Sequence, residues 1–284
     1  MVARSRLAIL AAATVVACAK PQECKLEPVP PGAHGGAFLW RAHKGGDVVW
    51  LYGTIHDANL DAVPPVAKNA LEKSVRYVSE LGDAEPDREL FIKYARIDDG
   101  PGIDQQLPAS EWYDLRDTLV GVIKEDDLRR AAPWYAMTLL STHMAPTKEQ
   151  SMDVLFGERA KELAMPVEAL ETWEEQMSAL AKAVDVADLK EAIHARHEMT
   201  CDFARMRASY EAGDTKTMEA LLVIPKTQAT MLDARNARWL PKIEAYFARG
   251  GAFVAVGLGH LLGPHGLPAL LAGDGYTVER IGLP

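Results

Sequence analysis

Two histidines follow apolar segments in the same way, near opposite ends of the chain. His56 lies three residues after Gly53 in VWLYGTIHDAN, and His260 lies three residues after Gly257 in AFVAVGLGHLLGP. A neutral imidazole near physiological pH can bind a metal ion or transfer a proton. The glycine lets the chain turn off a strand without a side chain crowding the site. One such unit is weak evidence, because a histidine beside a strand is often only structural, but two units indicate a shared mechanism.

A carboxylate is placed to complete the set. Glu80 ends another strand-like segment, and a helical pattern separates it from His56. A strand–helix–strand crossover predicts that Glu80 lies beside the loop that carries His56. His56, Glu80 and His260 then form a ligand set for a divalent transition metal such as manganese, cobalt or zinc, with open positions for water. Two alternatives stay open: Glu80 is a general base, or it is a solvated residue at a strand end.

Three more polar residues are expected near this set. Arg235, in DARNARW, can clamp a carboxylate or stabilise a developing oxyanion, although an ordinary helix arginine is the simpler interpretation. Asn236 beside it can position a neighbour. Glu171 follows a strand-like segment and is expected to support the site or a helix cap, with a structural use favoured, and Thr172 is a candidate cap. The pattern assigns no role to Asp153.

Short strands and longer helices must position these residues. Six segments are strand-like, namely Phe38–Ala42, Val48–Tyr52, Val75–Ser79, Val167–Leu170, Ala252–Val256 and Tyr276–Ile281. Helical patterns cover Val63–Lys73, Asp188–Tyr210 and Thr227–Phe247, with Pro241 expected to break or kink the last. Their order predicts an α/β domain with a large helical insertion. Ligands of open α/β sheets bind at strand ends, so aligned strands would bring both histidines to one edge.

Composition limits the function classes. The 284 residues are 48% hydrophobic and 25% charged, which is enough for a sizeable core in one large domain or two small ones. The formal net charge is −9 and there is no basic cluster, which argues against a nucleic-acid partner.

The first residues predict export. Residues 1–17 have the basic start and the apolar stretch of a signal peptide, and the stretch is too short to span a bilayer comfortably. VVAC resembles a bacterial lipobox, which predicts cleavage before Cys18 and lipidation of its thiol. A plain secretory signal is the alternative. Residues 18–36 are expected to be a tether rich in proline and glycine, and residues 37–284 the folded domain.

Lipidation would anchor the protein in the bacterial cell envelope. Ala19 is not the aspartate that signals retention, so the expected address is the outer membrane, facing the periplasm. Cys24 and Cys201 can form a disulfide in that oxidising compartment, which would attach the tail to a long helix. The alternative is that Cys201 is a buried free thiol.

Several segments, in this order, carry a family resemblance. They are LYGTIH, SELGDAE, APW at residues 132–134, ALETWEEQ, ARNARW and the terminal VGLGHLLGPHGLPALLAGDGYTVERI. Together they resemble the TraB/GumN family from about residue 37 to the C-terminus. The resemblance implies a mixed central sheet covered by helices, similar to erythromycin-esterase-like and haem-binding ChaN-like proteins. The family includes the Tiki proteins, which are metal-dependent proteases. Departures from the family pattern are Asp57, where an apolar residue is frequent, and His265, where an acidic or amide residue is frequent.

For the site, the resemblance implies that His56, Glu80 and His260 carry the chemistry, with Arg235 as a fourth member. The first functional expectation is a metal-dependent, peptidase-like hydrolase acting on an unidentified peptide or small molecule. The second is a lipoprotein that binds haem or a metal without turnover, with His56 or His260 as a ligand. The third is a metal-free hydrolase in which the two histidines act as acid and base.

Overall fold

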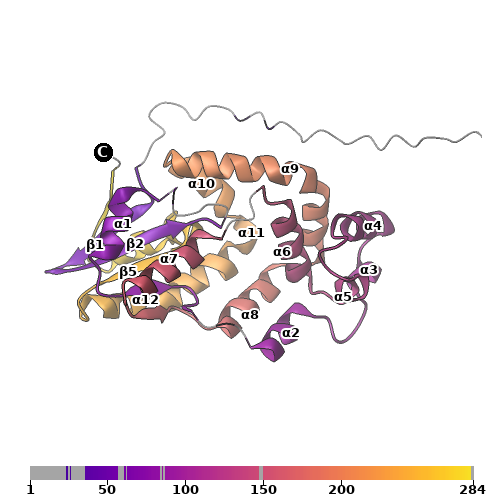
Figure 1. Ribbon diagram of the computed structural model, residues 1–284, viewed down its shortest axis with the longest axis horizontal. Helices are drawn as coiled ribbons and strands as arrows, with labels where there is room; N and C mark the ends of the chain where they lie inside the picture. Colours follow the sequence, from indigo (N-terminus) through magenta and orange to yellow (C-terminus); the bar gives the residue numbers. More distant parts are fainter. Residues whose placement is uncertain are drawn as a thin grey trace, which may run out of the picture.

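The computed structural model describes residues 24, 26, 36–56, 61, 63–83, 85, 87–146 and 150–282. The predicted signal peptide, Cys18, most of the tether and Asp57 lie outside these residues. The described chain forms a sheet-containing lobe and a helical lobe, drawn on the left and right of Figure 1. Among its helices, none has the length and apolar character needed to cross a membrane.

A mixed sheet of six strands organises the first lobe. All six predicted strands are present within a few residues: β1 (Leu39–Lys44), β2 (Asp47–Thr54), β3 (Tyr77–Ser79), β4 (Val167–Ala169), β5 (Ala252–Gly257) and β6 (Thr277–Arg280). Their order across the sheet is β4-β3-β5-β2-β1-β6. The pairs β2–β5, β5–β3 and β3–β4 are parallel, whereas β1 is antiparallel to both β2 and β6. The expected α/β fold with a mixed central sheet is confirmed.

The order of the strands adds a detail that the predicted crossover did not specify. The crossover from β2 through α1 (Pro65–Glu72) does not place β3 beside β2, because β5 lies between them. The first five residues of β5, AFVAV, are all buried. Such a continuous apolar run is typical of a strand covered on both faces, and it suits the middle of the sheet better than the short β3 does.

Aromatic rings fix helix α7 (Met152–Glu162) on one face of the sheet. Phe156 of α7 packs against Tyr52, Tyr77 and Phe253, with ring centroids 5.3, 6.4 and 5.5 Å apart. These three rings come from the neighbouring strands β2, β3 and β5. Because each pair adds both buried apolar area and a favourable ring geometry, these contacts hold α7 against all three strands.

The C-terminal helices also pack on the sheet lobe. Helix α12 (Ala234–Phe247) contacts β2 and α13 (Leu267–Gly273). Figure 1 shows α12 beside the sheet. A short π-helix, Ala229–Asp233, precedes α12. Pro241 lies inside α12 without ending it, so of the two expected effects, a break or a kink, the break does not occur. Pro241 is exposed, and water can bond the carbonyl that its missing N–H leaves free.

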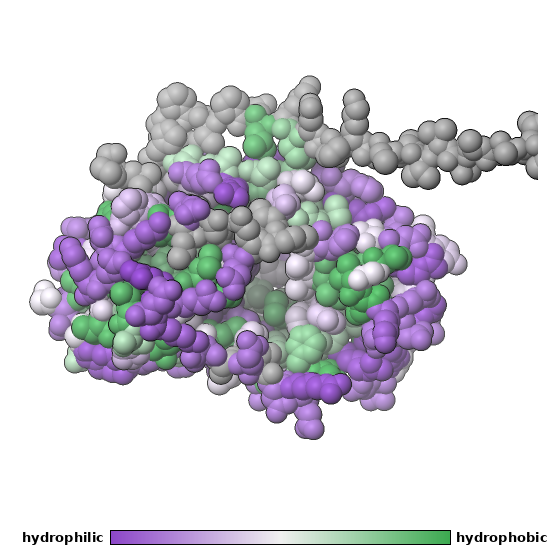
Figure 2. Space-filling model, viewed as in Figure 1, coloured by the Kyte–Doolittle hydropathy of each residue, from purple (hydrophilic) through white to green (hydrophobic). Residues whose placement is uncertain are grey.

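The helical insertion forms the second lobe and has its own core. It contains α2 (Arg88–Ala95), α3 (Ile103–Gln106), α4 (Ala109–Thr118), α5 (Glu125–Arg129), α6 (Pro133–Met144) and α8 (Trp173–Ala183). Ile103, Leu115, Leu140 and Leu189 are fully buried in this core. Helix α9 (Val186–Glu211) crosses from this lobe to the sheet lobe along the top of Figure 1, and α10 (Thr215–Leu222) and α11 (Pro225–Gln228) lead back to α12. Figure 2 shows the surface hollowed between the lobes, with apolar side chains in the hollow.

A disulfide attaches the start of the chain to α9. Cys24 and Cys201 are joined, with Cα atoms 5.2 Å apart. The free-thiol alternative for Cys201 therefore does not hold. The disulfide links residues separated by 177 positions in the sequence.

Candidate active site

The strands that precede the two histidines end side by side. In the parallel β2–β5 pair, Gly53 lies opposite Val256 and Thr54 lies opposite Gly257. The chain segments that carry His56 and His260 therefore leave the sheet at the same edge, as the sequence predicts.

The two glycines permit close packing at this edge. A Cβ atom on Gly53 would lie 2.5 Å from Leu258 Cδ1 and 3.2 Å from Leu258 Cα, in the 3-10 turn Leu258–Leu261. A Cβ atom on Gly257 would lie 3.3 Å from Glu80 Oε1. Gly257 thus keeps a side chain from crowding Glu80, and Gly53 makes room for the turn that carries His260.

A buried arginine holds two carboxylates together. Arg235 Nη2 donates to Glu80 Oε2 at 2.5 Å and to Glu171 Oε1 at 2.6 Å, and its Nε donates to both Glu171 oxygens at 3.1 and 3.2 Å. Its Nη1 donates to the Met231 carbonyl at 3.0 Å and to His260 Nε2 at 2.9 Å. Every N–H of the guanidinium has a partner, and the side chain is 4% exposed. This arrangement leaves no donor for a substrate oxygen and favours a positioning role for Arg235.

His260 is neutral, and its neighbours fix its tautomer. Its Nδ1 lies 2.7 Å from Asn236 Oδ1, while Asn236 Nδ2 donates to the carbonyls of His260 and His265 at 3.1 and 2.9 Å. Since the amide oxygen only accepts, Nδ1 carries the hydrogen and Nε2 accepts from Arg235. Burial lowers the pKa of His260 to about 3. Trp239 packs on the ring, with centroids 4.4 Å apart.

Glu80 connects this buried cluster to the solvent side. Its Oε1 accepts from the Gly257 amide at 2.8 Å, and its Oε2 accepts from Gln176 Nε2 at 3.0 Å. Burial would raise the pKa of Glu80, but the nearby imidazole of His260, the charge of Arg235 and the hydrogen bond from the Gly257 amide outweigh it and lower the pKa. His260 Nε2 lies 3.8 Å from Glu80 Oε1. Glu80 is therefore an ionised and firmly held carboxylate.

The metal set expected from the sequence is not assembled in this arrangement. Within the part of the chain that the structure describes, no three His, Cys, Asp or Glu side chains are grouped so as to hold a metal ion. The guanidinium of Arg235 occupies both the lone pair of His260 Nε2 and one oxygen of Glu80. A cation would have to displace that positive charge before these two groups could become ligands.

His56 pairs instead with Asp153, in the first turn of α7. Its Nδ1 lies 3.2 Å from Asp153 Oδ2, while Thr54 Oγ1 donates to Asp153 Oδ1 at 2.5 Å. The interaction with Asp153 raises the pKa of His56. Because the imidazole side chain is 87% exposed, water screens part of this attraction. Asp153 thus holds one ring nitrogen, and no described residue bonds Nε2.

Tyr210 of α9 holds the two elements that carry this pair. Its hydroxyl donates to the Gly53 carbonyl at 2.6 Å and lies 2.8 Å from the Tyr52 hydroxyl and 3.5 Å from Met152 Sδ. Gly53 precedes Thr54 in β2, and Met152 precedes Asp153 in α7. One buried hydroxyl therefore fixes the spacing between the strand and the helix.

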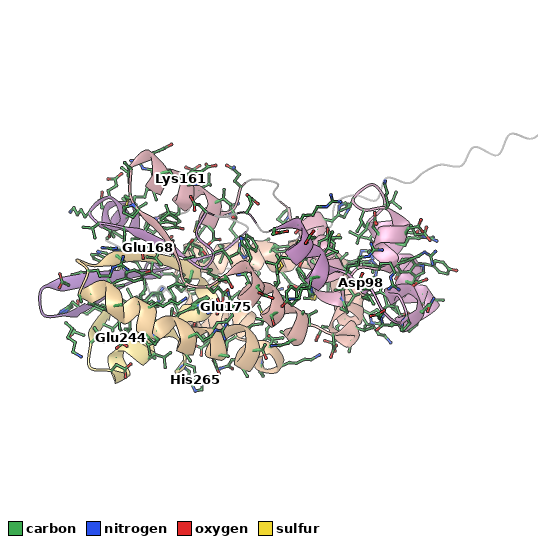
Figure 3. The ribbon with its side chains drawn as sticks, turned by 90° about the horizontal axis from the view of Figure 1, so that it is seen from below. Asp98, Lys161, Glu168, Glu175, Glu244 and His265 are labelled. Carbon is green, nitrogen blue, oxygen red and sulfur yellow. A yellow bond between two sulfur atoms is a disulfide. The ribbon has the colours of Figure 1, made fainter. Side chains whose placement is uncertain are left out.

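A cavity of about 520 Å³ opens beside His56, between α7 and α8. Its walls come from His56, from the end of β3 and the loop that follows, and from both helices: Tyr77, Ser79, Glu80, Leu81, Gly82, Asp83, Glu85, Asp153, Val154, Gly157, Glu158, Lys161, Trp173 and Gln176. Figure 3 labels Lys161 near the end of α7 and Glu175 in the first turn of α8. The volume suits a small molecule or one or two side chains of a peptide.

The family comparison agrees with this architecture. The model of the TraB/PrgY/gumN family matches residues 38–280, which span the whole sheet and every residue of the site. The chain belongs to the TraB/PrgY/gumN family. Searches of curated proteins and of solved structures each gave no significant match.

The site of this TraB-family chain therefore has two parts. The outer part contains the exposed His56 and the half-buried Asp153, and the buried part contains Arg235, Glu171 and His260, with Glu80 between them. Glu171 pairs with Arg235 and is 1% exposed, while the α8 cap is a reciprocal pair of Thr172 and Glu175.

Sequence reasoning missed Asp153 and Tyr210. An acidic residue in the first turn of a helix is common for helix stability alone, so nothing in the sequence around Asp153 distinguishes it. Tyr210 lies on the buried side of a long amphipathic helix, where an aromatic residue is usually just part of the core.

Proposed function

We propose that this cavity is the active site of a hydrolase in which His56 is the acid–base group and Asp153 orients it. The observation that carries the proposal is the chain of contacts from Thr54 to Asp153 to His56 at the edge of the cavity. A carboxylate on Nδ1 fixes the ring and favours its protonated form, so that Nε2 can give and take a proton. The reaction class is hydrolysis of an acyl bond in a peptide or an ester.

The chemistry requires one proton at Nε2. Protonated His56 donates this proton to the leaving atom as the acyl bond breaks. Water supplies the new bond to the acyl carbon, and its proton returns to His56, so the imidazole ends the cycle unchanged. Asp153 stays ionised throughout and stabilises the imidazolium.

The buried part of the site supports Glu80. Half-buried Glu80 lines the cavity, where its carboxylate can accept a hydrogen bond from the attacking water. Arg235 keeps that carboxylate ionised and in place, and Asn236 keeps His260 in the tautomer that accepts from Arg235. Arg235, Asn236 and His260 are therefore positioning residues in this proposal.

Metal-dependent hydrolysis is the competing form of the same function. It requires Arg235 to release His260 and Glu80.

Lipidation at Cys18 and an outer-membrane address remain proposals as well; they would place the cavity in the periplasm. Binding of haem or a metal without turnover predicts a ligand on His56 or His260 but no hydrolysis.

The test uses the full-length protein with fluorogenic peptides and short-chain esters as substrates. His56→Gln should lower turnover by about 10²- to 10⁴-fold, the usual contribution of a positioned acid–base group, without changing the fold. Asp153→Asn should move the alkaline limb of the pH–rate profile to lower pH, because the imidazolium loses its carboxylate partner. His197→Gln, at an exposed position on α9, is the matched control.

Two results would contradict the proposal. One is wild-type turnover in the folded His56→Gln variant. The other is activity that a chelator abolishes and that manganese, cobalt or zinc restores, which would support the metal-dependent form.

A further inference from the structure

The cavity walls carry more acidic than basic side chains. The carboxylates belong to Glu80, Asp83, Glu85, Asp153 and Glu158. The basic groups are the amine of Lys161 and the imidazole of His56. The field inside the cavity is therefore negative, which concentrates positively charged ligands.

Three of the carboxylates already have cationic partners. Glu80 is paired with Arg235, Asp153 with His56, and Asp83 Oδ2 lies 3.3 Å from Lys161 Nζ. Figure 3 shows Lys161 on α7, at the outer part of the sheet lobe. Glu85 and Glu158 are exposed and form no ion pair with any residue that the structure describes. The excess negative charge thus resides on Glu85 and Glu158.

One buried oxygen in the same cavity, the hydroxyl of Tyr77, forms no hydrogen bond with the described residues, and Tyr77 is only 1% exposed. Asp153 Oδ2, also buried, faces His56 Nδ1 at 3.2 Å and accepts no other hydrogen bond from the described residues. A buried polar atom without a partner is costly, so such atoms usually face a ligand or water. Both oxygens can accept a hydrogen bond.

An aromatic side chain completes the wall. Trp173, the first residue of α8, also lines the cavity. An indole face attracts ammonium and guanidinium groups more strongly than other side chains do. Uncompensated carboxylates, an unpartnered acceptor oxygen and an indole all favour the same kind of ligand.

We propose that the cavity recognises a primary ammonium group, carried by a lysine side chain or by a free polyamine. The ammonium donates hydrogen bonds to the Tyr77 hydroxyl and Asp153, while Glu85 and Glu158 attract its charge. This inference names the substrate class of the proposed hydrolase and rests on that function for its role in turnover. Binding itself does not need turnover.

The closing experiment is therefore calorimetric binding to the full-length protein. The probes are Nα-acetyl-lysine amide, its neutral counterpart Nα-acetyl-norleucine amide, and spermidine. The lysine probe should bind about tenfold or more tightly than the norleucine probe, because it adds a charge and hydrogen-bond donors in a negative cavity. Tighter binding of spermidine than of the lysine probe assigns a polyamine, and the reverse order assigns a peptide side chain.

Variants locate the binding. Glu85→Gln/Glu158→Gln should weaken the better cationic probe roughly fivefold, since it removes two charges but keeps the shape. Glu198→Gln, an exposed change on α9, should leave binding unchanged. Tyr77→Phe should weaken binding and yet keep or raise the melting temperature, because it deletes a hydroxyl without a partner.

Equal affinity for the lysine and norleucine probes, or no saturable binding of either cationic probe, overturns the inference. So does binding that is unaffected by the Glu85→Gln/Glu158→Gln change. A protein that binds the cationic probes but hydrolyses nothing keeps this inference and refutes the hydrolase. Hydrolysis of neutral substrates without binding of cationic probes refutes this inference and keeps the hydrolase proposal.

Discussion

Replacing Arg235 by methionine tests the buried part of the site most directly. The change keeps much of the apolar stem but removes a charge that contacts Glu80, Glu171 and His260. Glu171 is 1% exposed, so its carboxylate would stay buried without its main cation. Breaking one side of a buried ion pair typically costs about 3–5 kcal/mol.

The structure places the expected loss at the lower end of that range. Glu171 would keep the Gln176 amide at 3.3 Å and Arg238 Nη2 at 3.7 Å. We therefore expect a loss of about 3 kcal/mol, which for a protein of this size lowers the melting temperature by roughly 6–12 °C. The double change Arg235→Met/Glu171→Gln should recover about half of the loss, because the buried charge itself is gone.

Urea unfolding at pH 7, followed by far-UV circular dichroism, measures these differences. Arg238→Met is the matched control, because Arg238 lies on the same helix, is 44% exposed and should change stability by less than about 0.5 kcal/mol. An Arg235→Met protein as stable as that control would refute the description of Arg235 as the residue that holds the cluster. A double variant less stable than Arg235→Met would refute the charge argument.

Other changes test other parts of the fold. Burial lowers the pKa of His260 to about 3. As pH falls below 6.5, the unfolded chain therefore binds a proton that the native protein does not, and the free energy of unfolding should drop by about 1.4 kcal/mol per pH unit. Urea titrations of a His260→Gln variant that show the same slope would contradict this assignment. Tyr210→Phe should lower the free energy of unfolding by about 1–3 kcal/mol and reduce turnover through His56, because it removes the hydrogen bonds to Gly53 and Tyr52. Unchanged stability and turnover would contradict this role of the hydroxyl. Cys201→Ser should lower the stability by about 2–4 kcal/mol, and an unchanged unfolding midpoint would show that the attachment of Cys24 is not stabilising.

Local patterns allowed most of the fold to be predicted. Several strands, such as β2 and β5, are mainly apolar segments that end at glycine or a polar residue, and helices carry their own caps, as at Thr172. The order of the strands in the sheet was harder to predict, because strand pairing depends on contacts between residues that are distant in the sequence. The position of β5 between β3 and β2 follows from its burial on both faces, which the sequence suggests only in hindsight.

Residue type and spacing singled out the histidines, Glu80 and Arg235, but not what they bond. The saturation of Arg235 depends on acceptors from Glu80, Glu171, Met231 and His260, which come from four separate segments. The partner of His56 comes from α7, whose position over β2 is decided by aromatic packing at Phe156. Such pairings are a property of the packed chain and leave no local signal.

The central position of β5 also has a consequence for how the chain folds. Residues 252–257 are synthesised late, yet they lie between β3 and β2, which come from the first third of the chain. Until β5 inserts, both neighbours have an open edge, the Gly257 amide cannot bond Glu80, and Arg235 lacks His260. Such non-local pairing slows folding and exposes strand edges to aggregation. A chain truncated before Ala252 would therefore lack His260 and the Gly257 amide, leave two strand edges open, and be prone to misfolding and aggregation.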